Sequence, residues 1–123
     1  MKKVFLSSEK STAPLSGAVE VNGFLYVSGQ IHIDKEGNVR GETIKERFDL
    51  TISNIQRILE EADLTLKDVI RVQLYLTDIG ELPTLNQVYG KYFQHPFPAR
   101  TAIGVQTLPL GASLEIDIIA HRE

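Results

Sequence analysis

The strongest constraint on the fold is a change in the spacing of apolar residues between two neighbouring segments. From residue 44 to about residue 62, apolar side chains recur every three or four positions, at Ile44, Phe48, Ile52, Ile55, Leu59 and Ala62. This spacing places them on one stripe of an amphipathic helix. From Asp68 onwards the apolar spacing becomes two, which is typical of a strand with one buried face. The order predicts a sheet covered by a helix.

The residues around the start of this helix predict where it begins. Thr43 and Glu46 match a capping box, in which the threonine oxygen accepts from the backbone N–H of the glutamate and the glutamate reaches back. The face opposite the apolar stripe is charged and polar, and we interpret it as a solvated surface made of Lys45, Glu46, Arg47, Asp49, Gln56, Arg57, Glu60 and Glu61.

A β-hairpin is predicted near the N-terminus. Apolar-rich segments at residues 18–21 and 24–27 flank Asn22-Gly23, a pair in which both residues tolerate positive φ. The second strand continues through Ser28-Gly29-Gln30-Ile31, and a glycine at that position indicates either a bulge or close approach by another backbone or a ligand. Before the hairpin we expect a short strand at residues 4–6 and a polar loop through residues 11–14.

The second half of the chain predicts a strand, a helix and two further strands. In the first strand, Ile70, Val72, Leu74 and Leu76 share one face, and the other carries Arg71, Gln73, Tyr75 and Thr77. A helix follows, with Pro83 in its first turn and helical spacing of Leu82, Leu85, Val88, Tyr89 and Tyr92. Strands are expected at residues 100–105 and 113–121, separated by a turn at 107–111. The last strand alternates Leu114, Ile116, Ile118 and Ala120 with Glu115, Asp117, Ile119 and His121.

These elements predict a single α/β (α+β) domain over residues 1–123, with one mixed sheet and both helices packed on one face. The length fits one core, and 42% apolar with 24% charged residues is typical of a globular protein. No element remains to cover the other face of the sheet, where we expect Val19, Val21, Tyr75 and Ile119. Burial of apolar area is favourable, so we expect a homo-oligomer that packs the free faces together, with Glu115 near a subunit interface.

The composition argues against several classes of function. The chain has no cysteine, which excludes thiolate catalysis, and His32, His95 and His121 are too far apart in sequence to indicate a metal site. A net charge of −3 argues against a nucleic-acid-binding protein. The N-terminus is too weakly apolar for a signal peptide, and no apolar run reaches membrane-spanning length, so a cytoplasmic protein without membrane contact is expected.

One arginine and one glutamate are the main candidates for chemistry. Two prolines in residues 95–105 fix the approach to Arg100, whose planar guanidinium suits a carboxylate or phosphate. Glu115 lies inside the following strand, and a glutamate there is uncommon unless it is paired or functional. If these strands form a hairpin, the two side chains could share a cleft, as an anion clamp beside a general base or simply as a stabilising ion pair. Asn86 on the second helix is either solvated or used by a neighbouring subunit.

At these positions the sequence resembles the reactive intermediate deaminase family, RidA, also called the YjgF or endoribonuclease L-PSP-like family. The resemblance covers essentially the whole chain and rests on Ser28-Gly29-Gln30-Ile31, Asn86 with Tyr89, Pro98-Ala99-Arg100 and Leu114-Glu115-Ile116. It implies a chorismate-mutase-like domain that forms a homotrimer with three ligand sites between subunits.

The resemblance also implies an activity, namely cofactor-free hydrolysis of 2-imino acids or their enamine tautomers to 2-oxo acids and ammonia, as in 2-iminobutanoate/2-iminopropanoate deaminases. Arg100 would bind the substrate carboxylate, and Glu115 would hold or activate the attacking water. Substrate would also contact Ser28, Gly29, Gln30, Asn86 and Tyr89.

Two implied pocket positions depart from the family's pattern. Leu15 stands where many deaminases have a tyrosine, and Ala102 stands where they have a cysteine. We expect a more apolar pocket of different shape. Two alternatives therefore stay open: a non-catalytic protein that binds a small carboxylate such as a 2-oxo acid in the same cleft, and a ribonuclease or translation inhibitor. The acidic charge balance and the lack of a basic, aromatic stretch make the RNA-directed alternative the weakest.

Overall fold

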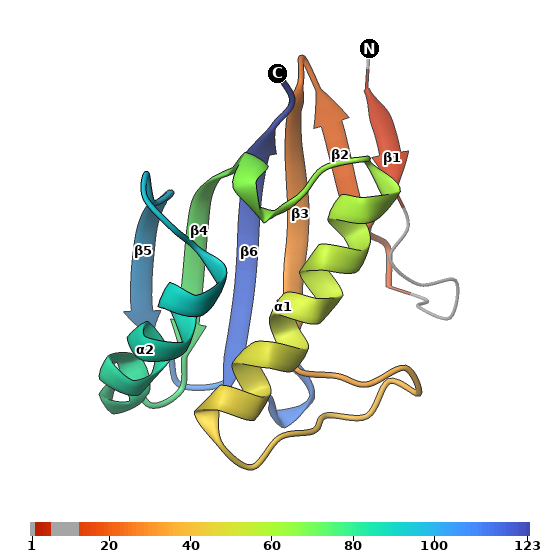
Figure 1. Ribbon diagram of the computed structural model, residues 1–123. Coiled ribbons are helices and arrows are strands. Elements are labelled where there is room, and N and C mark those ends of the chain that lie inside the picture. The colour runs from red at the N-terminus through yellow and green to blue at the C-terminus, as the bar shows by residue number, and fades with distance from the viewer. Residues whose placement is uncertain (1, 6–12) are drawn as a thin grey trace.

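The computed structural model describes residues 2–5 and 13–123, so Leu6, Ser11 and Thr12 of the expected first strand and loop lie outside the described residues. The described residues form a mixed six-stranded sheet in the order β1-β2-β3-β6-β4-β5 (Figure 1). The strands are β1 Lys3–Phe5, β2 Ala18–Val21, β3 Phe24–Ile31, β4 Val69–Leu76, β5 Ala99–Gly104 and β6 Leu114–His121. The helices are α1 Ile44–Glu61 and α2 Leu82–Tyr92, with short 3₁₀ turns η1 Leu66–Asp68, η2 Ile79–Glu81 and η3 Pro109–Gly111.

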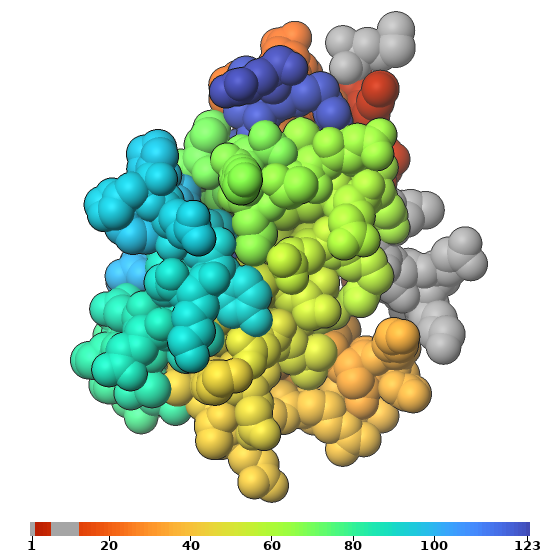
Figure 2. Space-filling view, viewed as in Figure 1, coloured from red at the N-terminus to blue at the C-terminus, as the bar shows by residue number. Residues whose placement is uncertain are grey.

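Two crossover connections place both helices on one face of the sheet, as the sequence predicts. Strands β3 and β4 are both antiparallel to β6, and α1 connects them across that face. Helix α2 connects β4 to its parallel neighbour β5. Parallel strands need such crossovers, and their shared handedness brings the helices to the same side. Seen from that side, the atoms of α1 and α2 cover the sheet (Figure 2).

The core lies between the helices and the sheet and follows the predicted apolar periods. On β6 the buried residues are Leu114, Ile116, Ile118 and Ala120, none of them more than 1% exposed. The whole predicted helical stripe is buried, at Ile44, Phe48, Ile52, Ile55 and Leu59 of α1 and at Ala62 directly after it. None of the described helices is long and apolar enough to cross a membrane.

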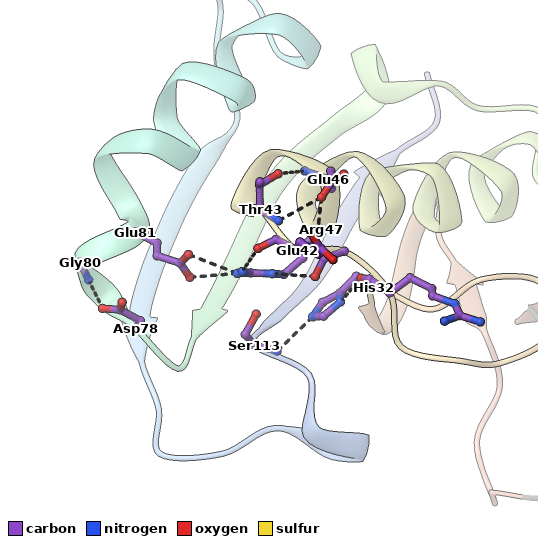
Figure 3. Close-up of polar contacts among 11 residues, drawn as sticks. His32, Glu42, Thr43, Glu46, Arg47, Asp78, Gly80, Glu81 and Ser113 are labelled. Atoms are coloured by element: carbon purple, nitrogen blue, oxygen red, sulfur yellow. Dashed lines mark hydrogen bonds and ion pairs between the residues drawn. The ribbon is translucent and has the colours of Figure 1, made fainter.

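The hairpin and the helix start are confirmed in detail. Asn22 and Gly23 both have positive φ, 53° and 82°, as a two-residue turn between twisted strands requires. The Thr43 hydroxyl accepts from the backbone N–H of Glu46 at 3.1 Å, and the Glu46 carboxylate accepts from the Thr43 backbone N–H at 3.1 Å (Figure 3).

Two sequence-based interpretations of which side chains are buried are wrong. Ile70 is 43% exposed, because a register shift between Val69 and Arg71 breaks the alternation at the start of β4. Arg47 does not belong to a solvated surface: its side chain is 16% exposed and pairs with Glu81 at 3.2 Å (Figure 3). That ion pair ties the first turn of α1 to the turn before α2.

The face of the sheet away from the helices carries apolar side chains, as expected. Cross-strand pairing aligns Val4, Val19, Tyr26 and Ile119 in one row over β1, β2, β3 and β6. Val4 is 52% and Tyr26 46% exposed, and Ile103 on β5 is 44% exposed. We call this surface the open face. Packing of a second chain against the open face would remove these apolar residues from water.

The capping box of α1 gives a direct test of how the helix begins. Replacing Thr43 with alanine removes the hydroxyl acceptor, so we expect the free energy of unfolding to fall by about 1 kcal/mol. Thr43→Ser keeps the oxygen and serves as the matched control, with a much smaller loss. Urea unfolding at equal protomer concentration measures both. Equal losses in the two variants would contradict the role of the cap.

Candidate functional site

Glu115 lies on the open face at the centre of the sheet. It belongs to β6, where its cross-strand partners are Ile31 of β3 on one side and Tyr75 of β4 on the other. Its neighbours in sequence, Leu114 and Ile116, are fully buried on the helix side, so alternation turns Glu115 the opposite way. The Glu115 carboxyl group lies against Gly29: a Cβ added to that glycine would be 2.9 Å from Glu115 Cδ.

The sequence indicated either a β-bulge or a close approach at Gly29, and the structure has both there. The register of β3 against β6 shifts between Val27 and Gln30, which is the bulge. Side-chain hydrogen bonds hold this bulge in place. The Ser28 hydroxyl donates to the Ser16 carbonyl oxygen at 2.6 Å, and the Gln30 amide donates to the Ser28 carbonyl oxygen at 3.0 Å.

Leu15 belongs to the segment that the Ser28 hydroxyl fastens to the bulge. Leu15 directly precedes Ser16 and is 57% exposed. The backbone of the same segment is also tied to β3, since the Ser28 N–H donates to the Gly17 carbonyl oxygen at 2.9 Å. The structure thus groups Leu15, Ser28, Gly29, Gln30 and Glu115, and we call this group the glutamate half-site.

The surroundings of Glu115 favour its protonated form. Burial raises the pKa of the Glu115 carboxyl group above its ordinary value, and the negative charge of nearby Asp117 raises it further. Asp117 is the next residue on the same face of β6, and the amide of Gln73 donates to its carboxylate at 3.0 Å. A carboxyl group in this setting is a candidate general base or acid.

Arg100 lies on β5 and points to the other side of the sheet. It pairs with Val72, which is fully buried against the helices. The Arg100 Cζ atom lies 4.8 Å from the centre of the Tyr89 ring of α2, which is a cation–π contact. Tyr89 is 6% exposed and stacks on Phe93 at 4.6 Å, so the ring beneath the guanidinium is held firmly.

A pocket of about 240 Å³ opens beside this arginine and is lined by Tyr89, Phe97, Pro98 and Arg100. Its wall is apolar apart from the guanidinium. The Tyr89 hydroxyl is buried and has no hydrogen-bond partner among the described residues, and burial raises its pKa. Ala102 lies two residues further along β5, on the same face as Arg100. We call Arg100, Tyr89, Phe97, Pro98 and Ala102 the arginine half-site.

The two half-sites do not meet within one chain, so the expected Arg100–Glu115 hairpin is wrong. Strand β4 lies between β5 and β6, because α2 makes β5 the parallel partner of β4 and β6 occupies the place between β3 and β4. The two residues are also offset along β4, because Arg100 pairs with Val72 of β4 whereas Glu115 pairs with Tyr75, three residues further on. Since the two side chains face opposite sides of the sheet, a cross-strand ion pair is excluded.

Asn86 is exposed on α2, one turn before Tyr89, and lies on the helix side with the arginine half-site. Sequence reasoning missed the pocket roles of Phe97 and Pro98, because it considered only how the two prolines fix the approach to Arg100. It placed Asp117 on the last strand but gave it no role. The alternation on the last strand already placed Asp117 on the same face as Glu115, and that signal was sufficient to connect them.

Comparison with known proteins agrees with this architecture. Residues 6–122 match the family model described as Endoribonuclease L-PSP. A RutC family protein of Aquifex aeolicus is 45% identical over 109 residues, covering 87% of each chain. A Rid family protein of Yersinia pestis has a solved structure with a TM-score of 0.92, 32% identity and coverage of 99% of this chain and 100% of that one.

A third similar protein is named RidA, the family that the sequence motifs resemble. The crystal structure of RidA from an Antarctic Psychrobacter superimposes with a TM-score of 0.88 at 31% identity, covering 97% of this chain and 98% of that one. The expected fold class is confirmed by these neighbours. The family match spans nearly the whole sequence, and the chain therefore belongs to the Rid/YjgF family, which includes the RutC proteins and is also described as Endoribonuclease L-PSP.

Proposed function

We propose that this protein is a cofactor-free hydrolase that converts reactive 2-imino acids, or their enamine tautomers, to 2-oxo acids and ammonia. The proposal is of the 2-iminobutanoate/2-iminopropanoate deaminase type. The observation that carries it is the pairing of two complementary half-sites: a guanidinium stacked on a buried ring beside an apolar pocket, and a carboxyl group of raised pKa over a glycine. The first suits a small carboxylate, and the second suits a water molecule.

Because the half-sites lie on opposite faces of the sheet, a complete site requires two copies of the chain. An interface that brings the arginine half-site of one copy to the glutamate half-site of the next is heterologous, and such an interface forms a ring when the rotation between copies closes. The family resemblance implies a ring of three, with three equivalent sites. The exposed apolar residues Val4, Tyr26 and Ile103 support burial of the open face in this assembly.

The chemistry needs few groups, because imines already react with water. Arg100 would bind the substrate carboxylate through two parallel hydrogen bonds and place the C=N carbon near Glu115. The Glu115 carboxylate takes a proton from water as the water oxygen bonds to that carbon and passes it to the imine nitrogen, which gives a carbinolamine. Glu115 then takes the hydroxyl proton and passes it to the amine nitrogen as the C=O bond forms and the C–N bond breaks, so a 2-oxo acid and ammonia result.

The pocket beside Arg100 supports an apolar substrate side chain. Phe97 and Pro98 line it. Ala102, on the same face of β5 as Arg100, adds a small apolar residue to this half-site. Leu15 adds an apolar residue to the glutamate half-site. Small imino acids with alkyl side chains therefore fit the proposal better than acidic ones.

A second candidate function is binding of a 2-oxo acid without turnover. The apolar pocket with a single guanidinium supports it, because carboxylate binding requires only the arginine half-site. Isothermal titration calorimetry with 2-oxobutyrate, with no hydrolysis of any imine, would favour this function. A ribonuclease function, suggested by the description of the family model, has less support, because the net charge is −3 and no basic, aromatic stretch is present.

The first prediction from the proposed function concerns Arg100. Hydrogen bonds to a charged group contribute about 1.5–3 kcal/mol each, so Arg100→Ala should lower kcat/KM for imine hydrolysis by roughly 10²-fold or more. Arg100→Lys keeps the charge but loses the two-pronged geometry, and should recover only part of the loss. Ammonia release from imines made in situ by an amino-acid oxidase measures both. Lys91→Ala, on an exposed position of α2, is the control, and equal activity in Arg100→Ala would refute the carboxylate contact.

The second prediction concerns pH. If Glu115 acts as a base, kcat/KM should rise with pH as Glu115 loses its proton, with a midpoint above the ordinary value of 4.5. Asp117→Asn removes the charge that raises the pKa of Glu115, so the midpoint should move to lower pH. Glu115→Gln should lower kcat by about 10²–10⁴-fold. Rates without enzyme are subtracted at each pH, and a midpoint that stays in place in Asp117→Asn would argue against this assignment.

The third prediction concerns assembly. Tyr26→Glu would place a carboxylate in the proposed interface, where an unpaired buried charge costs about 3–5 kcal/mol. Sedimentation velocity should show trimers for the unmodified protein and smaller species for this variant, with loss of activity. Ser53→Glu adds the same charge on an exposed position of α1, on the helix side, and should leave the trimer intact. A Tyr26→Glu protein that stays trimeric would place the interface elsewhere.

A further inference from the structure

A buried histidine lies next to the glutamate half-site and has no part in the chemistry described above. His32 directly follows the last residue of β3 and is 3% exposed. Its Nδ1 atom lies 2.6 Å from the Arg40 carbonyl oxygen, and its Nε2 atom lies 3.0 Å from the Ser113 backbone nitrogen (Figure 3). A carbonyl only accepts and a backbone N–H only donates, so the hydrogen must be on Nδ1 and Nε2 must be the acceptor.

The backbone on both sides of His32 is fixed to α1. The Asn54 side-chain amide is buried and donates to the carbonyl oxygens of Ile31 and Ile33, each at 3.1 Å. The His32 carbonyl oxygen also accepts from the Arg40 N–H at 2.9 Å. The imidazole therefore extends from a rigid base toward the start of β6.

The far end of this contact is Ser113, the residue directly before β6. Ser113 lies two positions before Glu115, and its carbonyl oxygen accepts from the Thr77 N–H at 3.1 Å. His32 thus holds the Ser113 backbone from the β3 side, and Thr77 holds it from the β4 side. This arrangement fixes the start of β6 relative to both of its neighbours.

The Glu115 side chain is closely packed against its neighbours. Its carboxyl group lies against Gly29, where even a single added carbon would be only 2.9 Å from Cδ. Ile31, which precedes His32, is the cross-strand partner of Glu115. A shift of the first residues of β6 would therefore move the carboxyl group relative to the Gly29 bulge.

We propose that His32 is a positioning residue for Glu115, acting through the hydrogen bond from the Ser113 N–H to Nε2. The proposal rests on the function proposed above for Glu115. It assigns a distinct role to each imidazole nitrogen: Nδ1 fastens the ring to the loop at Arg40, and Nε2 fixes β6. Burial lowers the pKa of His32, with a smaller contribution from Arg47 on α1, which keeps Nε2 free to accept.

Two substitutions separate the roles of the two nitrogens. In His32→Asn the side-chain amide occupies the position of Nδ1 and can donate to the Arg40 carbonyl oxygen, but nothing reaches Ser113. In His32→Gln the longer side chain places an oxygen near the position of Nε2, where it can accept from the Ser113 N–H. Both variants lose one of the two hydrogen bonds, so their losses in unfolding free energy should be similar.

Imine hydrolysis by the assembled protein tests the proposal. A misplacement of about 1 Å can cost roughly 10²-fold in rate, so we expect His32→Asn to lower kcat by roughly 10- to 100-fold with little change in KM. His32→Gln should restore most of kcat. In ¹⁵N-labelled unmodified protein, a scalar coupling between the Ser113 amide nitrogen and His32 Nε2 should be detectable across the hydrogen bond. Equal losses of kcat in the two variants, full kcat in His32→Asn, or absence of the coupling would overturn the proposal.

A second readout does not require any activity. Carbon-13 NMR titration of the Glu115 carboxyl group should give a pKa that moves toward the ordinary value in His32→Asn and stays near that of the unmodified protein in His32→Gln. If the unmodified protein hydrolyses no imine, the proposed function fails, and this titration still decides the role of His32. An identical Glu115 pKa in all three proteins would overturn the positioning role.

Discussion

The placement of β6 between β3 and β4 is the constraint on which the rest of the structure depends. The last strand of the chain forms the centre of the sheet, antiparallel to both neighbours, and its apolar residues fill the core beneath α1. Its alternation then decides which side chains lie on the other face, and these include Glu115 and Asp117. A shift of one residue would exchange the core with the open face, so packing of the apolar side fixes the position of the carboxyl groups.

Features that depend on local conformation or on a regular period could be predicted from the sequence. The Asn22-Gly23 turn, the Thr43 cap and the alternation of β6 all follow from backbone geometry or from burial of one face. The strand neighbours could not be predicted in the same way, because they depend on where the crossovers lead. Adjacent strands in sequence are often adjacent in space, but α2 carries β5 to the edge of the sheet and leaves β4 between β5 and β6. Arg47 was misassigned for a similar reason, since its partner Glu81 is 34 residues away.

The candidate site was predictable in its residue types but not in its geometry. A guanidinium after two prolines and a glutamate between apolar residues are visible in the sequence. The face that each side chain occupies depends on the strand register against β4. This register pairs Arg100 with Val72 and Glu115 with Tyr75. Gly29 shows this difference: the sequence allowed a bulge or a close approach, and the structure has both, because Gly29 lies in the bulge and its missing side chain leaves the space that Glu115 occupies.

The two half-sites lie on opposite faces of the sheet, so different residues hold Arg100 and Glu115 in place. Arg100 is held by the ring of Tyr89, whose own position depends on α2 and Phe93. Glu115 depends on β3, on Asp117 and, in our proposal, on the hydrogen bond from Ser113 to His32. No described side chain is common to the two sets, so substitutions around Tyr89 should alter carboxylate binding without altering the pKa of Glu115. Only the assembly would couple them, and a change at the interface should therefore affect both binding and turnover, whereas changes within either half affect one.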